Sequence, residues 1–473
     1  MRQLLVVALV FAGCRDKPAA PPASQGAVGS SRAAADPWRS VDEPSPPDTP
    51  ESRRKRAEAA LGRVRTIEPE VGKLRALVFD REVPAQYQTA GEFQAAVRRE
   101  IAKELPPERS HNLSAALAQL GFLRQPVDIA EVEQQAMATQ AGAYYDPTAK
   151  KFFLVMVPDN NLMLDTISAH ELTHALQDQH FDLTRYLPSD GSIDDDAALA
   201  RRFVAEGDAT FVMLLYAMHG ILGDKISPAV IATLRRQITQ FASLGVDELK
   251  AMSRSQAAGF GMMDPEIKKS IEAMDDIPPV VLVPLLESYM KGSLVALTAY
   301  EHGGWPSVDA LYRDPPASTE QVLHPETKLI PVRDPPRRVT LARTADADLL
   351  SNVLGELLWR IYFELWKAPH PAEAAEGWGG DRYAVARRKD GRLIGRIATT
   401  WDSAEDAEQF THAYLASLAA RFPGADVSHP TTGVARPDGG KVFVRTAGTR
   451  VFIVDGADDG SALDALVRTT TFD

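Results

Sequence analysis

Cysteine is almost absent from this sequence, because Cys14 is the only one among its 473 residues. No intramolecular disulfide can form, and a lone cysteine near the N-terminus is better explained by a lipid anchor than by redox chemistry. An excess of positive charge is also absent, since 64 acidic residues outnumber 52 basic ones and the net charge is −12. With no basic stripe in the chain, the composition argues against nucleic acid as a partner.

The N-terminal residues have the pattern of a bacterial lipoprotein signal peptide. Arg2 precedes an apolar run over residues 4–12, which is too short to span a bilayer as a mature helix. The run ends in Phe-Ala-Gly-Cys, which resembles a lipobox, so Cys14 is predicted to be lipidated; the alternative is an ordinary signal peptide cleaved nearby. Because Arg15 follows, we expect a lipid anchor in the outer membrane of a bacterial cell envelope, with the protein on the periplasmic or surface side.

Composition divides the chain into four segments. Residues 1–14 are the expected signal peptide, and residues 15–55 are rich in proline, alanine and serine, which predicts a disordered tether. Residues 56–335 are expected to form a mainly helical domain with a small β-hairpin. Residues 336–473 carry two further hairpin patterns among helices and predict a small α+β module. The expected fold class is therefore α+β.

The pentapeptide HELTH, residues 170–174, is the pattern that carries chemistry. On an α-helix, residues four apart lie on one face with Cβ atoms about 5–6 Å apart. His170 and His174 can therefore bind one zinc ion together. Glu171 then lies next to the open coordination position, where it can take a proton from a zinc-bound water.

The residues before this pentapeptide predict a hairpin and a helix start. Two aromatic or β-branched runs flank a turn signal at residues 146–148, which predicts a β-hairpin over residues 141–157. In zinc peptidases an edge strand in this place commonly pairs with the extended substrate, although a purely structural hairpin is equally compatible with the pattern. Asp165 or Thr166 is expected to cap the start of the following helix.

A catalytic zinc site needs a third protein ligand, and two residues compete for this role. His180 creates a spacing that resembles the metzincin motif, but that family has glycine where this chain has Gln177, so the sharp end of the helix is not expected. Glu206 lies in an apolar stripe of the following helix, where a buried carboxylate is costly unless it is paired or binds a metal. An ion pair with Arg202 is the structural alternative. We favour Glu206, and we expect Gly207 to let its helix approach the zinc helix closely.

Three blocks of sequence together resemble a gluzincin-type zinc metallopeptidase, and more narrowly a group of exported prokaryotic HExxH proteins. The blocks are HELTHALQDQHFDL (170–183), EGDAT (206–210) and GGWPSVDALYRDPPASTEQVLHPE (303–326), with a weaker echo at residues 378–383. The resemblance implies that residues 56–335 form a zincin-like metallopeptidase domain in which Zn²⁺ is held by His170, His174 and Glu206. It also implies a distant histidine or tyrosine that donates to the oxyanion, for which His324 is the candidate and Tyr289 the alternative.

The resulting hypothesis is an envelope-anchored zinc peptidase that acts on peptides or proteins. The rival hypothesis is a non-catalytic envelope lipoprotein that uses a zincin-like scaffold to bind peptides. The intact Glu171 favours the enzyme, since a purely structural zinc site is normally closed by a fourth protein ligand. Gluzincins often place an aspartate one helical turn after the ligand glutamate. Here Thr210 has that position and Asp208 lies off the face, which leaves open which residue orients the histidines.

Overall fold

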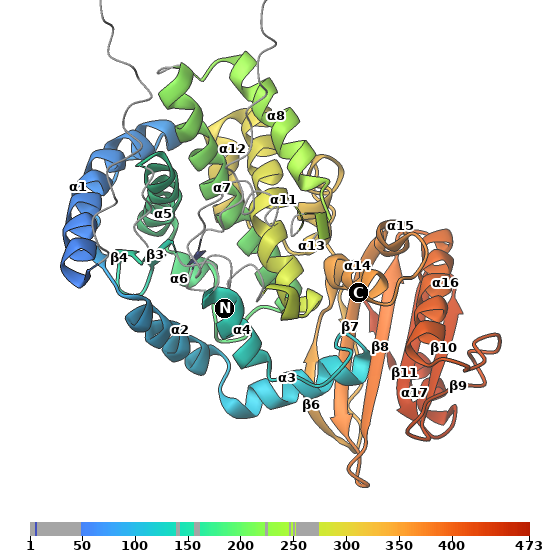
Figure 1. Ribbon diagram of the computed structural model, residues 1–473. Coiled ribbons are helices and arrows are strands. Elements are labelled where there is room, and N and C mark those ends of the chain that lie inside the picture. Colours follow the sequence, from blue (N-terminus) through green and yellow to red (C-terminus); the bar gives the residue numbers. More distant parts are fainter. Residues whose placement is uncertain are drawn as a thin grey trace, which may run out of the picture.

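The computed structural model of this chain describes residues 5–6, 49–138, 142–155, 161–222, 226–245, 247–248, 251 and 274–473. The fold is α+β, with helices dominating the N-terminal part and a six-stranded sheet forming the C-terminal part (Figure 1). Cys14, with nearly all of the expected signal peptide and most of the expected tether, lies outside the described residues. The tether ends earlier than expected, because Thr49 and Ser52 form a capping box and the first long helix starts at Pro50.

The elements of the N-terminal part follow in chain order. They are β1 (Leu5–Val6), α1 (Pro50–Arg75), β2 (Ala85–Tyr87), α2 (Ala90–Glu104), α3 (Pro107–Leu120), α4 (Ile129–Ala138), β3 (Ala143–Asp146), β4 (Lys151–Leu154), α5 (Asn161–Phe181), α6 (Leu183–Tyr186), α7 (Asp195–Leu222), α8 (Pro228–Ala242), η1 (Met274–Asp276), α11 (Pro279–Gly303), α12 (Trp305–Arg313), α13 (Thr319–Leu323) and η2 (Pro325–Leu329).

The hairpin predicted before the HELTH segment is confirmed. β3 and β4 pair in antiparallel fashion, with Ala143 opposite Leu154. β2 pairs with β4 in parallel, and β1 runs antiparallel along the other edge of β3. β3 also packs against α5, the helix that carries HELTH. Its outer edge accepts another extended segment, which in this structure is β1.

α5 carries the HELTH segment and packs between α1 and α7 (Figure 1). All residues from 167 to 178 are buried, so polar side chains on this helix face protein instead of water and need partners there. The expectation that Asp165 or Thr166 caps the helix is wrong, because α5 starts at Asn161, upstream of both. Asp165 instead forms an ion pair with Arg63 on α1, which ties the two helices together.

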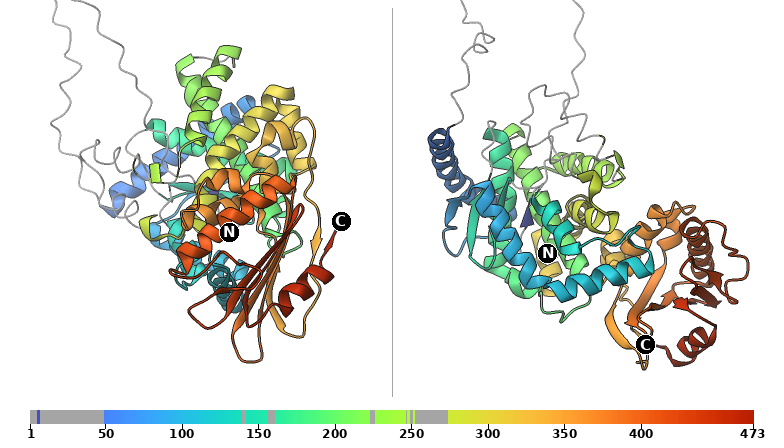
Figure 2. Two further views of the ribbon diagram at one scale, coloured as in Figure 1. Left: turned by 90° about the vertical axis from the view of Figure 1, so that its right-hand side faces the viewer. Right: turned by 60° about the horizontal axis from the view of Figure 1, so that its bottom comes forward.

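The C-terminal part is an antiparallel sheet covered by helices on both faces (Figure 2). Side chains alternate along a strand, so Val442 and Val444 of β10 join the apolar cluster of Phe410, whereas Phe443 joins that of Leu463. Both predicted hairpins are present, as β7–β8 and β10–β11. The elements are β5 (Val339–Thr340), β6 (Ala347–Asn352), α14 (Gly355–Leu365), α15 (Pro371–Ala375), β7 (Trp378–Arg387), β8 (Leu393–Trp401), α16 (Ala404–Arg421), β9 (Val434–Ala435), β10 (Lys441–Ala447), β11 (Arg450–Ala457), α17 (Ser461–Thr469) and β12 (Thr471–Phe472).

The two parts share a hydrophobic core. One continuous cluster of buried apolar side chains joins α2, α3, α4 and α11 to α14, α16 and one face of the C-terminal sheet. A buried polar contact crosses the same boundary, since Gln119 on α3 donates to the carbonyl oxygen of Asp455 on β11 at 2.9 Å. The helical part and the sheet are therefore packed directly on each other.

α11 owes its apolar sequence to its place in this core. Among the described residues it is the one helix long and apolar enough to cross a membrane, yet 78% of its apolar window is buried inside the protein. The long apolar helix is thus explained by packing within the protein.

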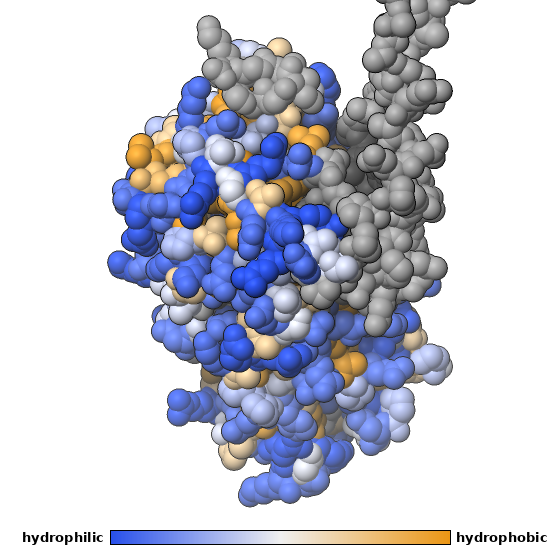
Figure 3. Space-filling view, turned by 60° about the vertical axis from the view of Figure 1, so that its left-hand side comes forward, coloured by the Kyte–Doolittle hydropathy of each residue, from blue (hydrophilic) through white to orange (hydrophobic). Residues whose placement is uncertain are grey.

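The surface on the left-hand side of Figure 1 is mostly hydrophilic, with hydrophobic residues in small groups (Figure 3).

Candidate metal centre

Two histidines and a glutamate meet where α5 packs against α7. The Nε2 atoms of His170 and His174 are 3.0 Å apart on adjacent turns of α5. Glu206 on α7 places its Oε2 at 3.3 Å from Nε2 of His170 and at 3.5 Å from Nε2 of His174. All three residues are buried, and one ligand atom from each lies within 4.8 Å of the others. The structure thus brings together the three predicted ligands, and Glu206 pairs with the histidines instead of with Arg202.

This group fits a metal ion. Ligand atoms at about 2.0–2.1 Å from a tetrahedral ion lie about 3.3–3.4 Å from each other, which is close to the spacing observed here. Among the described residues, both carboxylate oxygens of Glu206 are buried without a hydrogen-bond partner. Buried polar atoms are nearly always satisfied, and a cation is the partner that suits a carboxylate facing two imidazole nitrogens.

The protonation states of the group also suit a metal. Complete burial lowers the pKa of His170 to about 4, because the charged imidazolium loses its hydration. Burial alone would raise the pKa of Glu206, but the two adjacent histidines outweigh it and lower the pKa to about 2. At neutral pH the site therefore offers a neutral imidazole and an ionised carboxylate, which are the forms that bind metal ions.

Glu171 lies beside the ligands and is also buried. Its Oε2 accepts the backbone N–H of Tyr145 on β3 at 2.9 Å, whereas its Oε1 has no hydrogen-bond partner within the part of the chain that the structure describes. Burial, together with the negative charge of Glu206, raises the pKa of Glu171 well above its usual value. A carboxylate whose pKa is raised accepts a proton more readily near neutral pH, so Glu171 is suited to act as a general base.

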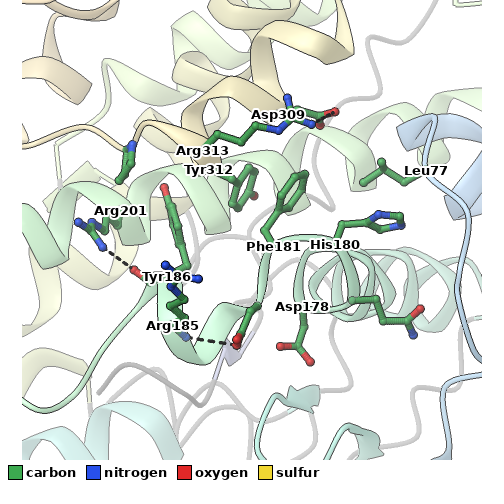
Figure 4. Close-up of a pocket in the computed structure, with 13 residues that line it drawn as sticks. Leu77, Asp178, His180, Phe181, Arg185, Tyr186, Arg201, Asp309, Tyr312 and Arg313 are labelled. Atoms are coloured by element: carbon green, nitrogen blue, oxygen red, sulfur yellow. Dashed lines mark hydrogen bonds and ion pairs between the residues drawn. The ribbon is translucent and has the colours of Figure 1, made fainter.

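His180, the other candidate for the third ligand, contacts a different part of the protein. Its Nε2 bonds to the carbonyl oxygen of Val78 at 2.8 Å, and its side chain is exposed. It lines a pocket of about 650 Å³ together with Phe181 and Tyr312 (Figure 4). α5 continues unbroken through Gln177, as expected for a helix that lacks the metzincin glycine.

Gln177 has a second property that the sequence analysis missed. Its Oε1 lies 2.8 Å from Nδ1 of His174, and its Nε2 donates to Asp208 at 3.1 Å and to the carbonyl oxygen of Ala205 at 3.0 Å. Asp208 was set aside because it lies off the face that carries Glu206. Asp208 nevertheless contacts the amide of Gln177, which lies behind His174. The available signal was a second acidic residue, two positions after Glu206, in the mostly apolar segment 203–213.

Gly207 has a different neighbour from the one expected. A Cβ atom at this position would lie 2.0 Å from the backbone C and O atoms of Gly292 on α11. The two glycines therefore let the backbones of α7 and α11 touch, so the nearest neighbour of Gly207 is α11 and not the HELTH helix. The contact fixes the backbone immediately next to Glu206.

The two candidates for the oxyanion donor, His324 and Tyr289, have different surroundings in the structure. His324 directs its Nε2 to Glu356 on α14 at 2.8 Å, and it does not belong to the metal-binding group found among the described residues. The ring of Tyr289 on α11 lies 5.7 Å from the ring of His170, measured between centroids. Tyr289 is therefore the candidate that the described contacts place beside His170, and the oxyanion role of His324 stays a prediction.

Comparisons with known proteins bear on the C-terminal sheet alone. Residues 342–466 match a family model described as a domain of unknown function (DUF8575). No curated protein and no solved structure matches the chain. The matched segment begins downstream of His170, His174 and Glu206 and includes none of them.

Proposed function

We propose that this protein is a zinc-dependent metallopeptidase with a zincin-like fold. The observation that supports the proposal is the buried group of His170, His174 and Glu206, with Glu171 beside it. Two imidazole nitrogens and one carboxylate oxygen are a ligand set of catalytic zinc sites, which keep the fourth position for water or substrate. The same set is less suited to Mg²⁺ or Ca²⁺, which prefer oxygen ligands throughout.

The residues of this chain have distinct roles in the proposed hydrolysis. When bound, zinc lowers the pKa of water and polarises a carbonyl oxygen. Glu171 takes the proton of the attacking water through the oxygen that has no other partner, and then passes it to the leaving amine. Its second oxygen is held by the N–H of Tyr145, which fixes the carboxylate. Tyr289, beside His170, donates to the oxyanion of the tetrahedral intermediate.

A peptide is the substrate class that the neighbouring strand favours. The outer edge of β3 accepts the extended residues 5–6 as strand β1. These residues belong to the expected signal peptide, and its removal would leave the edge open to another extended chain. β3 also supplies the N–H that holds Glu171. A peptide added at this edge would lie next to the proposed base, and we therefore propose peptide or protein substrates bound by strand addition.

A Glu171→Gln variant tests the function. It keeps the size of the side chain but removes the base, so we expect stoichiometric zinc and a loss of peptide cleavage of about 10²–10⁴-fold. The matched control is Glu131→Gln, the same chemical change at an exposed position of α4, which should cleave at the wild-type rate. Undiminished cleavage by Glu171→Gln would overturn the proposal, and a zinc-loaded wild-type protein that binds peptides without cleaving them would establish the non-catalytic alternative.

The proposed location is the bacterial cell envelope, through a lipid on Cys14. This part of the proposal rests on the lipobox-like sequence alone. Labelling with a fatty-acid analogue tests it, because a Cys14→Ser variant should lose both the label and the membrane association. Equal labelling of the two proteins would contradict the anchor.

A further inference from the structure

A chain of buried hydrogen bonds runs from His174 to a fixed positive charge. We propose that Gln177, Asp208 and Arg75 are positioning residues that hold His174 in the tautomer required for metal binding. The proposal rests on the metal site of the proposed function and extends it to α1, whose last residue is Arg75.

The outer end of this relay is the guanidinium of Arg75, which is completely buried. Its Nε donates to the two carboxylate oxygens of Asp208 at 2.8 and 3.1 Å, and its Nη2 donates to Asp309 on α12 at 2.7 Å. The guanidinium also lies 4.6 Å from the ring centroid of Trp305. Arginine stays charged in proteins, so Asp208 faces a permanent cation and is held as a carboxylate.

The carboxylate of Asp208 determines which way the amide of Gln177 points. Asp208 also accepts the hydroxyl of Tyr312 at 2.9 Å and Nε2 of Gln177 at 3.1 Å. An ionised carboxylate has no proton to donate, and neither has the carbonyl oxygen of Ala205 at 3.0 Å from the same nitrogen. The NH₂ group of Gln177 must therefore face these two acceptors, and its oxygen must face His174.

The orientation of Gln177 in turn determines the tautomer of His174. Oε1 of Gln177 lies 2.8 Å from Nδ1 of His174 and can only accept, so the proton of the neutral imidazole is on Nδ1. Nε2 then has its lone pair in the direction of His170 and Glu206. Metal-bound histidines typically donate their second N–H in this way, and the partner fixes both the tautomer and the ring orientation.

The two ligand histidines differ in this respect. His170 has no hydrogen-bond partner at Nδ1, so within the described residues the relay holds His174 alone. Three elements far apart in sequence build it, because Arg75 lies on α1, Gln177 on α5 and Asp208 on α7. The metal affinity of the site therefore depends on the position of α1.

Zinc affinity of the purified full-length protein, measured by competition with a chromogenic chelator, tests the relay. Gln177→Met removes the acceptor at similar side-chain length, and we expect zinc to bind about 10–100-fold more weakly. The matched control is Gln179→Met on the same helix. Its amide bonds to the backbone of Asp80 and Arg81, away from the metal ligands, so zinc affinity should equal that of the wild type.

A conservative variant separates positioning from a structural role. Gln177→Glu keeps an acceptor facing His174 but loses both donors and places a second carboxylate beside Asp208. We expect zinc affinity to recover most of the loss seen in Gln177→Met, while the metal-free protein melts at a lower temperature than the wild type. Absorption of the Co²⁺-loaded proteins should likewise match the wild type for Gln177→Glu and differ from it for Gln177→Met.

Three outcomes would overturn the relay. The first is wild-type zinc affinity in Gln177→Met. The second is an equal loss of affinity in Gln177→Met and Gln177→Glu that follows their loss of thermal stability, because this is the pattern of a purely structural residue. The third is a wild-type protein that binds no zinc, and this result alone would also remove the proposed function.

Discussion

The contact between Gly207 and Gly292 makes a sharp prediction about the stability of the metal centre. In a Gly207→Ala variant the new Cβ would lie 2.0 Å from backbone atoms of Gly292, whereas real Cβ contacts essentially never fall below 3.0 Å. Backbone atoms inside two packed helices cannot rotate away as a side chain can. α7 and α11 must therefore move apart by about 1 Å or more, and the packing around them must change.

The magnitude follows from two opposing effects. Overpacking of a core costs about 1–3 kcal/mol and occasionally more, and a clash between two backbones is at the upper end of that range. Alanine is favoured over glycine in a helix by about 1 kcal/mol, which offsets only part of the cost. We expect Gly207→Ala to lower the free energy of unfolding by about 2–3 kcal/mol. We also expect weaker zinc binding, because Glu206 moves with the displaced backbone and ligand distances tolerate only about 0.2 Å.

Urea unfolding of the metal-free protein and a zinc titration together measure these effects. The matched control is Gly62→Ala in α1, where an added Cβ meets no atom within 4 Å, so the same substitution should leave stability unchanged or raise it by up to about 1 kcal/mol. Gly207→Ala with the stability and zinc affinity of the wild type would refute the argument that the two backbones are in contact beside the ligand.

Three further predictions concern the ligands and the relay. Glu206→Ala should lose stoichiometric zinc under conditions where the wild type retains it, and retained zinc in a metal analysis would show that another residue is the third ligand. Arg75→Met should lower the free energy of unfolding in urea by about 3–5 kcal/mol, because it leaves Asp208 buried without its cation. Arg63→Met, which removes a partly exposed ion pair, should lower it by about 0–1 kcal/mol, and equal losses in the two variants would contradict this. Burial lowers the pKa of His170 from its usual 6.5 to about 4, so in the metal-free protein the stability from this group is complete above pH 6.5, and about 3 kcal/mol is lost as the pH falls from 6.5 through 4. Urea unfolding at pH 7, 5.5 and 4.5 should show this loss in the wild type and not in His170→Gln, and an equal pH dependence in both proteins would contradict it.

The parts of the site that could be predicted from the sequence depend on local geometry or on a simple cost of burial. The spacing of His170 and His174 on one helical face follows from the α-helix itself. Glu206 could be identified because a carboxylate in an apolar stripe needs a compensating partner. The hairpin before α5 has a turn signal between two strand-like runs, which also depends on neighbouring residues alone.

The parts that could not be predicted depend on which distant segments meet. Asp208 is 31 positions from Gln177 and 133 positions from Arg75, so no local pattern connects the three residues. The neighbour of Gly207 depends on how α11 crosses α7. His324 directly follows the short helix α13, which Ser318 caps, but its side chain bonds to Glu356 on α14, in the part of the chain that was expected to be a separate module.

Gln177 connects the choice of third ligand with the orientation of the second one. A glycine at this position would let α5 end and turn a later histidine back toward the metal, as in the metzincin spacing. With glutamine the helix continues, His180 bonds to the backbone of Val78, and the third ligand has to come from another element. The same glutamine extends its amide across to Asp208 on α7, the helix that provides Glu206. Gln177 therefore excludes the metzincin ligand set and supports the proposed one, because it links the two helices whose side chains form the candidate metal centre.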